Sequence, residues 1–282
     1  MKRSTRNLFR RNGWTILPSC KRHARGIVLS LLFVTATGGV TQGFEAYAPS
    51  GTAVDHSAFE RLLRTYVDQS GLVDYKAWKA QDEETLRNYL KTLSKVEPGR
   101  LGRSERLAFW INAYNALTIQ GILEFYPVKS IKDKVSRVLG FNIWDDYPMT
   151  VHGESHSLND IEHKILRKMG EPRIHFAIVC ASVGCPKLRN EAYTGANLDS
   201  QLEDQAESFF AESRNFRIDR KRGTVYLSSI LDWFGEDFGG SDGAKLDFAS
   251  RYLSEEEEKE FLRSGKAKVK YLDYDWSLNE QK

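Results

Sequence analysis

One segment of this sequence is apolar on nearly every side, and it limits the folds that the chain can adopt. From Ser104 to Tyr126, large apolar residues recur at helical spacing on one face, and alanine, isoleucine and leucine fill the opposite face. A helix without a polar side is stable only when other elements surround it. We therefore predict a buried central helix at about 104–126, ended by Pro127.

Two asparagines lie inside this predicted helix, and buried amides need hydrogen-bond partners. Asn112 and Asn115 therefore have two interpretations. In the first, they tie neighbouring loops to the core. In the second, one of them orients a catalytic group or a ligand. We favour the first, because most buried polar side chains are simply satisfied by such hydrogen bonds.

The remaining pattern predicts an α+β fold, with a small, mostly antiparallel sheet and flanking helices. The chain is 41% hydrophobic and 28% charged, which is typical of a globular protein. Residues 215–219 and 224–227 have the pattern of two strands joined by a charged turn. No linker rich in proline, glycine or serine interrupts residues 49–282, so we expect a single compact domain there.

Residues 1–48 have the pattern of an export signal and a short lead-in. A basic stretch ends at Arg25, an apolar run follows, and Thr41 and Gly43 are placed for cleavage before Phe44. The apolar run is short for a spanning helix, which needs about 20 residues. We therefore expect a cleaved signal and an exported protein, periplasmic or secreted. The alternative is a protein that stays anchored by this segment.

Charge is distributed unevenly along the chain. The whole sequence carries a net charge of +3, but residues 1–48 hold eight basic residues and one acid, so the remainder carries −4. A nucleic-acid partner is disfavoured for this acidic remainder. We expect a small-molecule or protein partner, and contact with a membrane only through an uncleaved N-terminal segment.

The cysteines give the clearest chemical signal. Apart from Cys20 in the leader, Cys180 and Cys185 are the only thiols. An apolar run at residues 176–179 predicts a central strand that ends at Cys180. His175 and Cys180 would then point to opposite faces, because side chains alternate along a strand. A direct thiol–imidazole pair would need a bulge or a histidine from elsewhere, and His156 is the other candidate.

Three interpretations of the thiol pair remain open. A structural disulfide, or two buried thiols that fix the loop, is the default for an exported protein. A redox-active or nucleophilic thiol needs an exposed sulfur with a lowered pKa. A metal pair lacks the two-residue spacing of zinc knuckles.

A second polar group invites a metal hypothesis, which the spacing supports only weakly. Residues His152, His156, Glu162 and His163 lie close together in the sequence. Only His163 is securely helical, so no helix face presents a preformed pair, whereas zinc needs three or four convergent ligands. We therefore predict no metal and no cofactor.

Several motifs together resemble the domain-of-unknown-function 547 family. They are DHS at 55–57, LAFWINAYNAL at 107–117, YPVKSI at 126–131, SLNDIEH at 157–163, RIHFAIVCAS at 173–182 followed by Cys185-Pro186, and YDWSLN at 274–279. The resemblance covers about residues 55–279. It implies relatives among exported bacterial proteins and among plant proteins in which the domain follows a predicted coiled coil. It implies no particular reaction.

Two functions from different classes are consistent with these observations. We favour a binding or structural domain of the cell envelope that catalyses no assignable reaction, because the spacing forces no nucleophile–base pair. The alternative is an envelope enzyme, a hydrolase or a thiol-dependent transferase or redox protein. Its candidate residues are Cys180 or Cys185 as nucleophile, His175 or His156 as base, and Asn112 or Asn115 as orienting group.

Overall fold

The computed structural model describes residues 53–133 and 143–282. The predicted export signal at residues 1–48 lies outside these residues. All described residues belong to one compact unit, Pro49–Lys282. Over the described residues, no helix combines the length and the hydrophobicity needed to cross a membrane.

Helices dominate the first part of the chain, and short strands appear in its second part. The helices are α1 (Ser57–Tyr66), α2 (Tyr75–Gln81), α3 (Glu83–Leu93), η1 (Pro98–Arg100), α4 (Arg103–Phe125), α5 (Ile143–Asp146), η2 (Asp160–Leu166), η3 (Arg167–Met169), η4 (Pro172–Phe176), α6 (Leu198–Ala211), α7 (Ile230–Trp233), η5 (Gly235–Phe238), α8 (Asp242–Ser250) and α9 (Glu256–Arg263). The strands are β1 (Met149–Val151), β2 (Glu154–His156), β3 (Phe216–Asp219), β4 (Thr224–Leu227) and β5 (Lys268–Tyr271).

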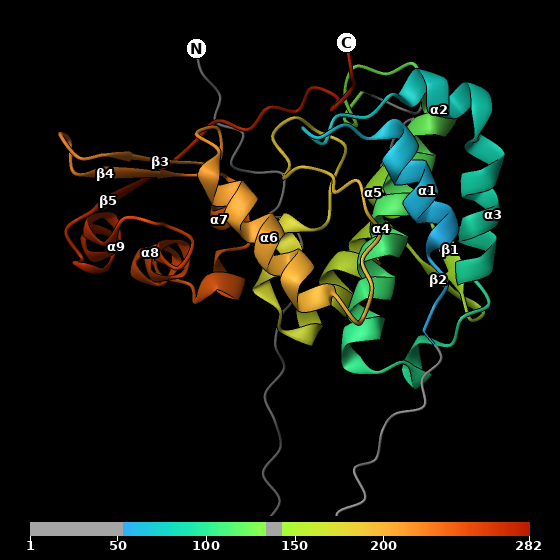
Figure 1. Ribbon diagram of the computed structural model, residues 1–282, viewed down its shortest axis with the longest axis horizontal. Helices are drawn as coiled ribbons and strands as arrows, with labels where there is room; N and C mark the ends of the chain where they lie inside the picture. Colours follow the sequence, from blue (N-terminus) through green and yellow to red (C-terminus); the bar gives the residue numbers. More distant parts are fainter. Residues whose placement is uncertain (1–52, 134–142) are drawn as a thin grey trace, which may run out of the picture. The chain divides into compact units, whose positions relative to one another are not determined.

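The central helix is present and buried, as its composition requires. In α4, every residue from 107 to 123 is buried. Figure 1 shows α1 and α3 on one side of α4 and α6 on the other. These neighbouring helices are amphipathic, and their apolar faces cover α4, which has no polar side of its own.

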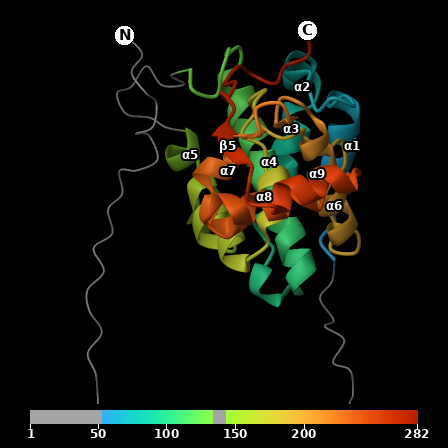
Figure 2. The same ribbon diagram turned by 90° about the vertical axis from the view of Figure 1, so that its left-hand side faces the viewer.

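The sheets are small and mostly antiparallel, which confirms the α+β prediction. β1 and β2 form one antiparallel pair, and β3 and β4 form the predicted hairpin. β5 adds to β4 in parallel, with Val225 opposite Val269. In Figure 2, the end of the molecule that carries α8, α9 and this three-stranded sheet faces the viewer.

The strand predicted at residues 176–179 is wrong. Pro172 opens the short 3₁₀-helix η4 instead, and the chain then runs without a neighbouring strand to Cys180. Side-chain amides replace the missing strand partners. Asn115 Nδ2 donates to the carbonyl of Ala177 over 3.0 Å, and Asn115 Oδ1 accepts from Val179 N–H over 2.9 Å. The apolar run therefore leaves the 3₁₀-helix and continues as irregular backbone outside any sheet.

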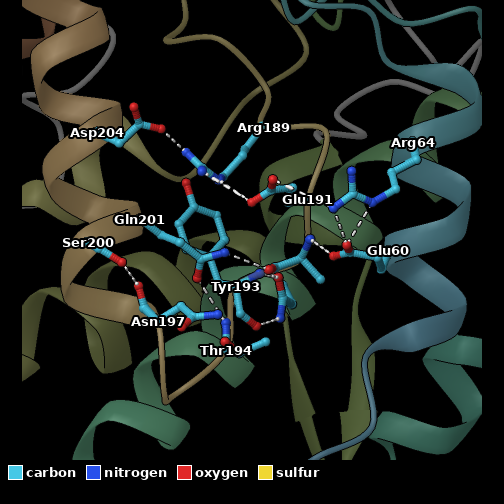
Figure 3. A network of polar contacts seen from close by, with 12 residues as sticks. Glu60, Arg64, Arg189, Glu191, Tyr193, Thr194, Asn197, Ser200, Gln201 and Asp204 are labelled. Atoms are coloured by element: carbon cyan, nitrogen blue, oxygen red, sulfur yellow. Dashed lines mark hydrogen bonds and ion pairs between the residues drawn. The ribbon is translucent and has the colours of Figure 1, made fainter.

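Asn112 holds the loop before α6 in the same way. Its Nδ2 donates to the carbonyl of Tyr193 over 2.7 Å, and its Oδ1 accepts from Tyr193 N–H over 2.9 Å. Figure 3 shows further ties to this loop: Glu60 of α1 accepts a backbone N–H over 2.8 Å, and Gln201 of α6 accepts from Thr194 N–H over 3.0 Å. Both asparagines thus tie loops to α4.

The described chain has two clusters of buried apolar side chains, and the segment around the cysteines runs between them. Phe176 belongs to the cluster formed with α6, α8 and the hairpin. Residues 177–179, Ala181 and Cys185 belong to the cluster around α4. Tyr274 packs against both clusters. The position of the thiols therefore depends on how these two clusters pack against each other.

We predict that Asn115→Ala lowers the free energy of unfolding by about 2–3 kcal/mol, because the backbone groups of Ala177 and Val179 lose their partners inside the core. Urea denaturation measures the change. Asn88→Ala on the exposed side of α3 is the matched control and should cost less than about 0.5 kcal/mol. Equal effects of the two substitutions would contradict the structural role of Asn115.

Candidate functional site

Both cysteines lie against one tyrosine hydroxyl. Tyr274 Oη is 3.2 Å from Cys180 Sγ and 3.0 Å from Cys185 Sγ. The backbone N–H of Cys180 also donates to Cys185 Sγ over 3.0 Å. Cys185 is only 4% exposed, whereas Cys180 is half-buried. We call Cys180, Cys185 and Tyr274 the thiol site. Both cysteines are free in the structure, so the disulfide stays a prediction.

The turn that brings the sulfurs together is strained. Ala181, directly after Cys180, has a φ of 57°, a left-handed conformation that is uncommon for a residue with a Cβ atom. The N–H of Cys185 then closes the turn on the carbonyl of Ser182 over 3.0 Å. Strained backbone of this kind is concentrated at functional sites, where the surrounding structure holds it in place. We call residues 180–185 the cysteine loop.

Backbone hydrogen bonds to a segment near the C-terminus hold the cysteine loop in place. The N–H of Val183 donates to the carbonyl of Ser277, and the N–H of Gly184 donates to the carbonyl of Asp275, each over 2.8 Å. A Cβ atom on Gly184 would lie 2.8 Å from the backbone nitrogen of Asp275, so only glycine permits this approach. The contact places the neighbouring Tyr274 over the sulfurs.

Hydrogen bonding favours a thiolate at Cys180. Hydrogen bonds with Cys185, Tyr274 and Ser182 lower the pKa of the Cys180 thiol despite its burial. Burial raises the pKa of Cys185, and the negative charge of Cys180 raises it further. The two thiols therefore hold one negative charge between them, because the first ionisation opposes the second. Cys180, the more accessible sulfur, is also the more acidic.

A buried carboxyl group interacts electrostatically with Cys180. Glu162 is 7% exposed and sits on η2, which is a π-helix. Burial raises the pKa of Glu162 to about 7, and the charge of Cys180 contributes to the increase. Single π-helical turns are frequent at functional sites. A reciprocal cap opens this helix, with Asp160 accepting from Ser157 N–H and Ser157 Oγ accepting from Asp160 N–H.

Tyr114 of α4 is hydrogen-bonded to this carboxyl and interacts electrostatically with both thiols. Its hydroxyl donates to Glu162 Oε2 over 3.3 Å. Burial raises the pKa of Tyr114, and the charges of Glu162, Cys180 and Cys185 raise it further. Burial and the charges of both cysteines likewise raise the pKa of Tyr274. Both phenols therefore stay protonated and act as hydrogen-bond donors to the acidic groups.

Half-buried aromatic rings surround the thiol site on the side of Tyr274. The rings of Trp233 and Trp276 lie 4.8 and 4.5 Å from the ring of Tyr274, centre to centre. Lys132 Nζ lies 3.2 Å from the centre of the Trp276 ring. Burial lowers the pKa of Lys132, whereas the charge of Cys180 favours its ammonium form. Lys132 therefore interacts electrostatically with Cys180 while its Nζ lies over an aromatic face.

His175 belongs to a different group of residues. Its Nε2 lies 2.7 Å from Asp237 Oδ2, and its ring stacks on Phe234 at 4.2 Å. Arg167 donates to the same carboxylate from Nε over 2.6 Å. Burial lowers the pKa of His175, which is 3% exposed. Among the described residues it forms no hydrogen bond with either thiol, so the structure does not bring His175 and Cys180 together as a nucleophile–base pair.

The other histidines are also separate from the thiols. His156 on β2 packs edge-on against Trp110, with ring centres 5.1 Å apart, and His163 Nδ1 lies 3.0 Å from a guanidinium nitrogen of Arg167. His152 lies in the turn between β1 and β2. Residues 53–133 and 143–282 contain no group of three or more His, Cys, Asp or Glu side chains placed to hold a metal.

Two residues of the site were not predicted as part of it. Glu162 was considered only as a metal ligand, although it lies four residues after Leu158 and four before Leu166, on the apolar face of its helix. That position was a usable signal for a buried carboxyl. Tyr274 lies 94 residues after Cys180, and nothing in the local sequence indicates their contact.

The fold and the site define an α+β domain in which a thiol pair lies against the hydroxyl of Tyr274. Residues 98–210 match the model of a family described as protein of unknown function, DUF547. This match confirms the predicted resemblance to the family over that segment. The match includes α4, Glu162 and both cysteines, whereas Tyr274 lies beyond it. Comparison with curated proteins and with solved structures gives no match.

We predict that Glu162 makes the stability of the protein fall with rising pH. Its pKa is about 7 in the folded protein, against 4.5 for a glutamate side chain in water, so the folded state holds the proton more tightly. The stabilisation is complete below pH 4.5 and is lost as the pH rises through 7. The loss from this group amounts to about 3 kcal/mol.

Glu162→Gln should remove most of this dependence, which denaturant titrations at pH 5 and pH 8 measure. Gln keeps the shape of the side chain and an oxygen for Tyr114 but does not ionise. Glu154→Gln, at an exposed position on β2, is the matched control and should leave the dependence unchanged. A Glu162→Gln protein with the pH dependence of the wild type would show that the buried carboxyl does not titrate near neutral pH.

Proposed function

We propose that this protein is a thiol-dependent protein in which Cys180 is the nucleophile. The observation that carries the proposal is the convergence of Tyr274 Oη and the second thiol of Cys185 on the half-buried Cys180 sulfur. A thiolate is the reactive form of cysteine, and hydrogen-bond donors stabilise it. The chemistry that fits is attack by sulfur on an electrophilic carbon or on a disulfide, as in a transferase, a hydrolase or a thiol-exchange protein.

Charged and aromatic groups around Cys180 support this proposal. Groups with shifted pKa values are concentrated at functional sites, and Cys180, Cys185 and Glu162 are all shifted within one cluster. Lys132 interacts electrostatically with Cys180, whose charge favours the ammonium form of the lysine. Among the described residues, no imidazole takes part in this arrangement, so His175 and His156 are not the bases that we propose.

A binding or structural domain is the second candidate, and the asparagines favour it. Asn112 and Asn115 each use both ends of their amide to hold loop backbone, which is an architectural task. In this case the thiols only fix the cysteine loop. Cys180→Ser would then destabilise the protein without removing a separate activity.

The reactivity of Cys180 tests the first proposal. We expect Cys180 in the native protein to react with iodoacetamide at pH 7 faster than the same cysteine in denatured protein, because more of it is thiolate. Tyr274→Phe should slow the native reaction by about fivefold, the equivalent of one hydrogen bond of about 1 kcal/mol. Mass spectrometry of the peptide that contains Cys180 gives the rates.

Tyr226→Phe on β4 is the control, because this tyrosine lies over Arg217 and away from the sulfurs. A native Cys180 that reacts more slowly than its denatured counterpart, in a correctly folded protein, would overturn the proposed nucleophile and support the structural role of the thiols.

We also propose that the protein acts outside the cytoplasm. The basic stretch that ends at Arg25 and the apolar run after it support this location, together with an acidic remainder that disfavours nucleic acid as a partner. We predict that the protein recovered from the cell envelope begins at Phe44, which N-terminal sequencing would establish. A protein recovered only from the cytoplasm, with its leader intact, would contradict export.

A further inference from the structure

The thiol site holds two sulfurs, although a single nucleophile needs only one. Tyr274 Oη lies 3.2 Å from Cys180 Sγ and 3.0 Å from Cys185 Sγ, so both sulfurs lie against the same hydroxyl. The backbone N–H of Cys180 donates to the sulfur of Cys185 over 3.0 Å. The second sulfur is therefore held against the residue that carries the proposed nucleophile.

The two thiols differ in exposure and in acidity. Cys185 is 4% exposed, whereas Cys180 is half-buried. Hydrogen bonds with Cys185 and Tyr274 lower the pKa of Cys180 to about 7, whereas burial raises the pKa of Cys185. A substrate therefore meets the sulfur of Cys180 first, and the enclosed sulfur of Cys185 reacts with a group that is already attached to Cys180.

The surroundings of the pair favour a disulfide over a carbonyl carbon as the substrate. Among the described residues, no histidine is hydrogen-bonded to either sulfur. Acyl transfer to a nucleophilic cysteine typically relies on such an adjacent base. Thiol–disulfide exchange needs only an attacking thiolate and a sulfur leaving group, which are the groups that this site supplies.

We propose that Cys180 and Cys185 form a dithiol that exchanges with substrate disulfides, with Cys180 as the attacking thiol and Cys185 as the resolving thiol. The inference rests on the proposed function, because it names the substrate class of the Cys180 nucleophile.

The exchange takes place in two steps. The thiolate of Cys180 attacks one sulfur of the substrate disulfide, the substrate S–S bond breaks, and one substrate thiolate leaves. Cys185 then loses its proton and attacks Cys180 Sγ, the mixed disulfide breaks, and the second substrate thiolate leaves. Two electrons pass from the dithiol to the substrate, which also takes up the two protons and ends as two thiols, while Cys180 and Cys185 become a disulfide.

The cysteine loop and Tyr274 assist the second step. Once Cys180 is bonded to the substrate, it no longer carries the negative charge that opposes the ionisation of Cys185. The N–H of Cys180 and the hydroxyl of Tyr274 remain as donors to the sulfur of Cys185. Tyr274 is thus a positioning residue for both thiols.

Reaction of the reduced protein with glutathione disulfide at pH 7 tests the inference. Mass spectrometry of the wild type should show a disulfide between Cys180 and Cys185, with less than about a tenth of the protein left as the mixed disulfide, because Cys185 resolves it. Cys185→Ser should stop at the mixed disulfide on Cys180. Cys180→Ser, the matched control, should form a mixed disulfide about tenfold more slowly or less, because its remaining thiol is buried and weakly acidic.

A second measurement uses only the wild-type chain, so it does not depend on the folding of a variant. In mixtures of reduced and oxidised glutathione, both cysteines should become protected from alkylation together, in one two-electron transition that reverses when reduced glutathione is added. A purely structural disulfide would form and then resist this reduction, which would overturn the inference.

Two further results distinguish failure of the inference from failure of the proposed function. A wild-type protein that accumulates the mixed disulfide on Cys180 as fully as Cys185→Ser does, while Cys180 still reacts rapidly with iodoacetamide, would overturn the resolving role and leave the nucleophile in place. A folded wild-type protein in which Cys180 reacts slowly with iodoacetamide and with glutathione disulfide alike would overturn both.

Discussion

The structure depends on the burial of one helix and on the few polar groups that it carries inside. Because α4 is covered on all sides, the amides and hydroxyls on it require partners among the groups that pack there, and Thr118 Oγ1 and Gln120 Oε1 find none in the described part of the chain. Asn115 meets this requirement by binding the backbone that leads to Cys180, and Tyr114 meets it by binding Glu162. The helix thus serves both as the apolar centre of the fold and as the rigid support from which the site is built.

Rigid support explains why a short, irregular segment can hold two sulfurs in place. The chain before Cys180 has no strand partner, yet its backbone groups are bound by side chains of α4 and α6. The turn after it is held by backbone contacts to the C-terminal segment. A loop fixed on both sides can retain the left-handed conformation of Ala181, which an unsupported loop would relax.

The sequence predicts local structure well here and predicts distant contacts poorly. The buried helix and the hairpin follow from periodicity and turn residues, which act over a few positions. The strand at 176–179 was wrong because its apolar pattern cannot show that the backbone partner is the amide of Asn115, some 60 residues earlier. The helical spacing around Glu162 was sufficient to predict that this carboxyl is buried. The contact of Tyr274 with the sulfurs, in contrast, depends on how the two apolar clusters pack against each other.

The contact between Tyr274 and the sulfurs has a consequence for biosynthesis. Cys180 and Cys185 are made 94 and 89 residues before this tyrosine, so a growing chain exposes two ordinary, weakly acidic cysteines until its last part has been synthesised and packed. The acidic character of Cys180 therefore arises only in the finished molecule. The lowered pKa of the Cys180 thiol is therefore a marker of complete assembly.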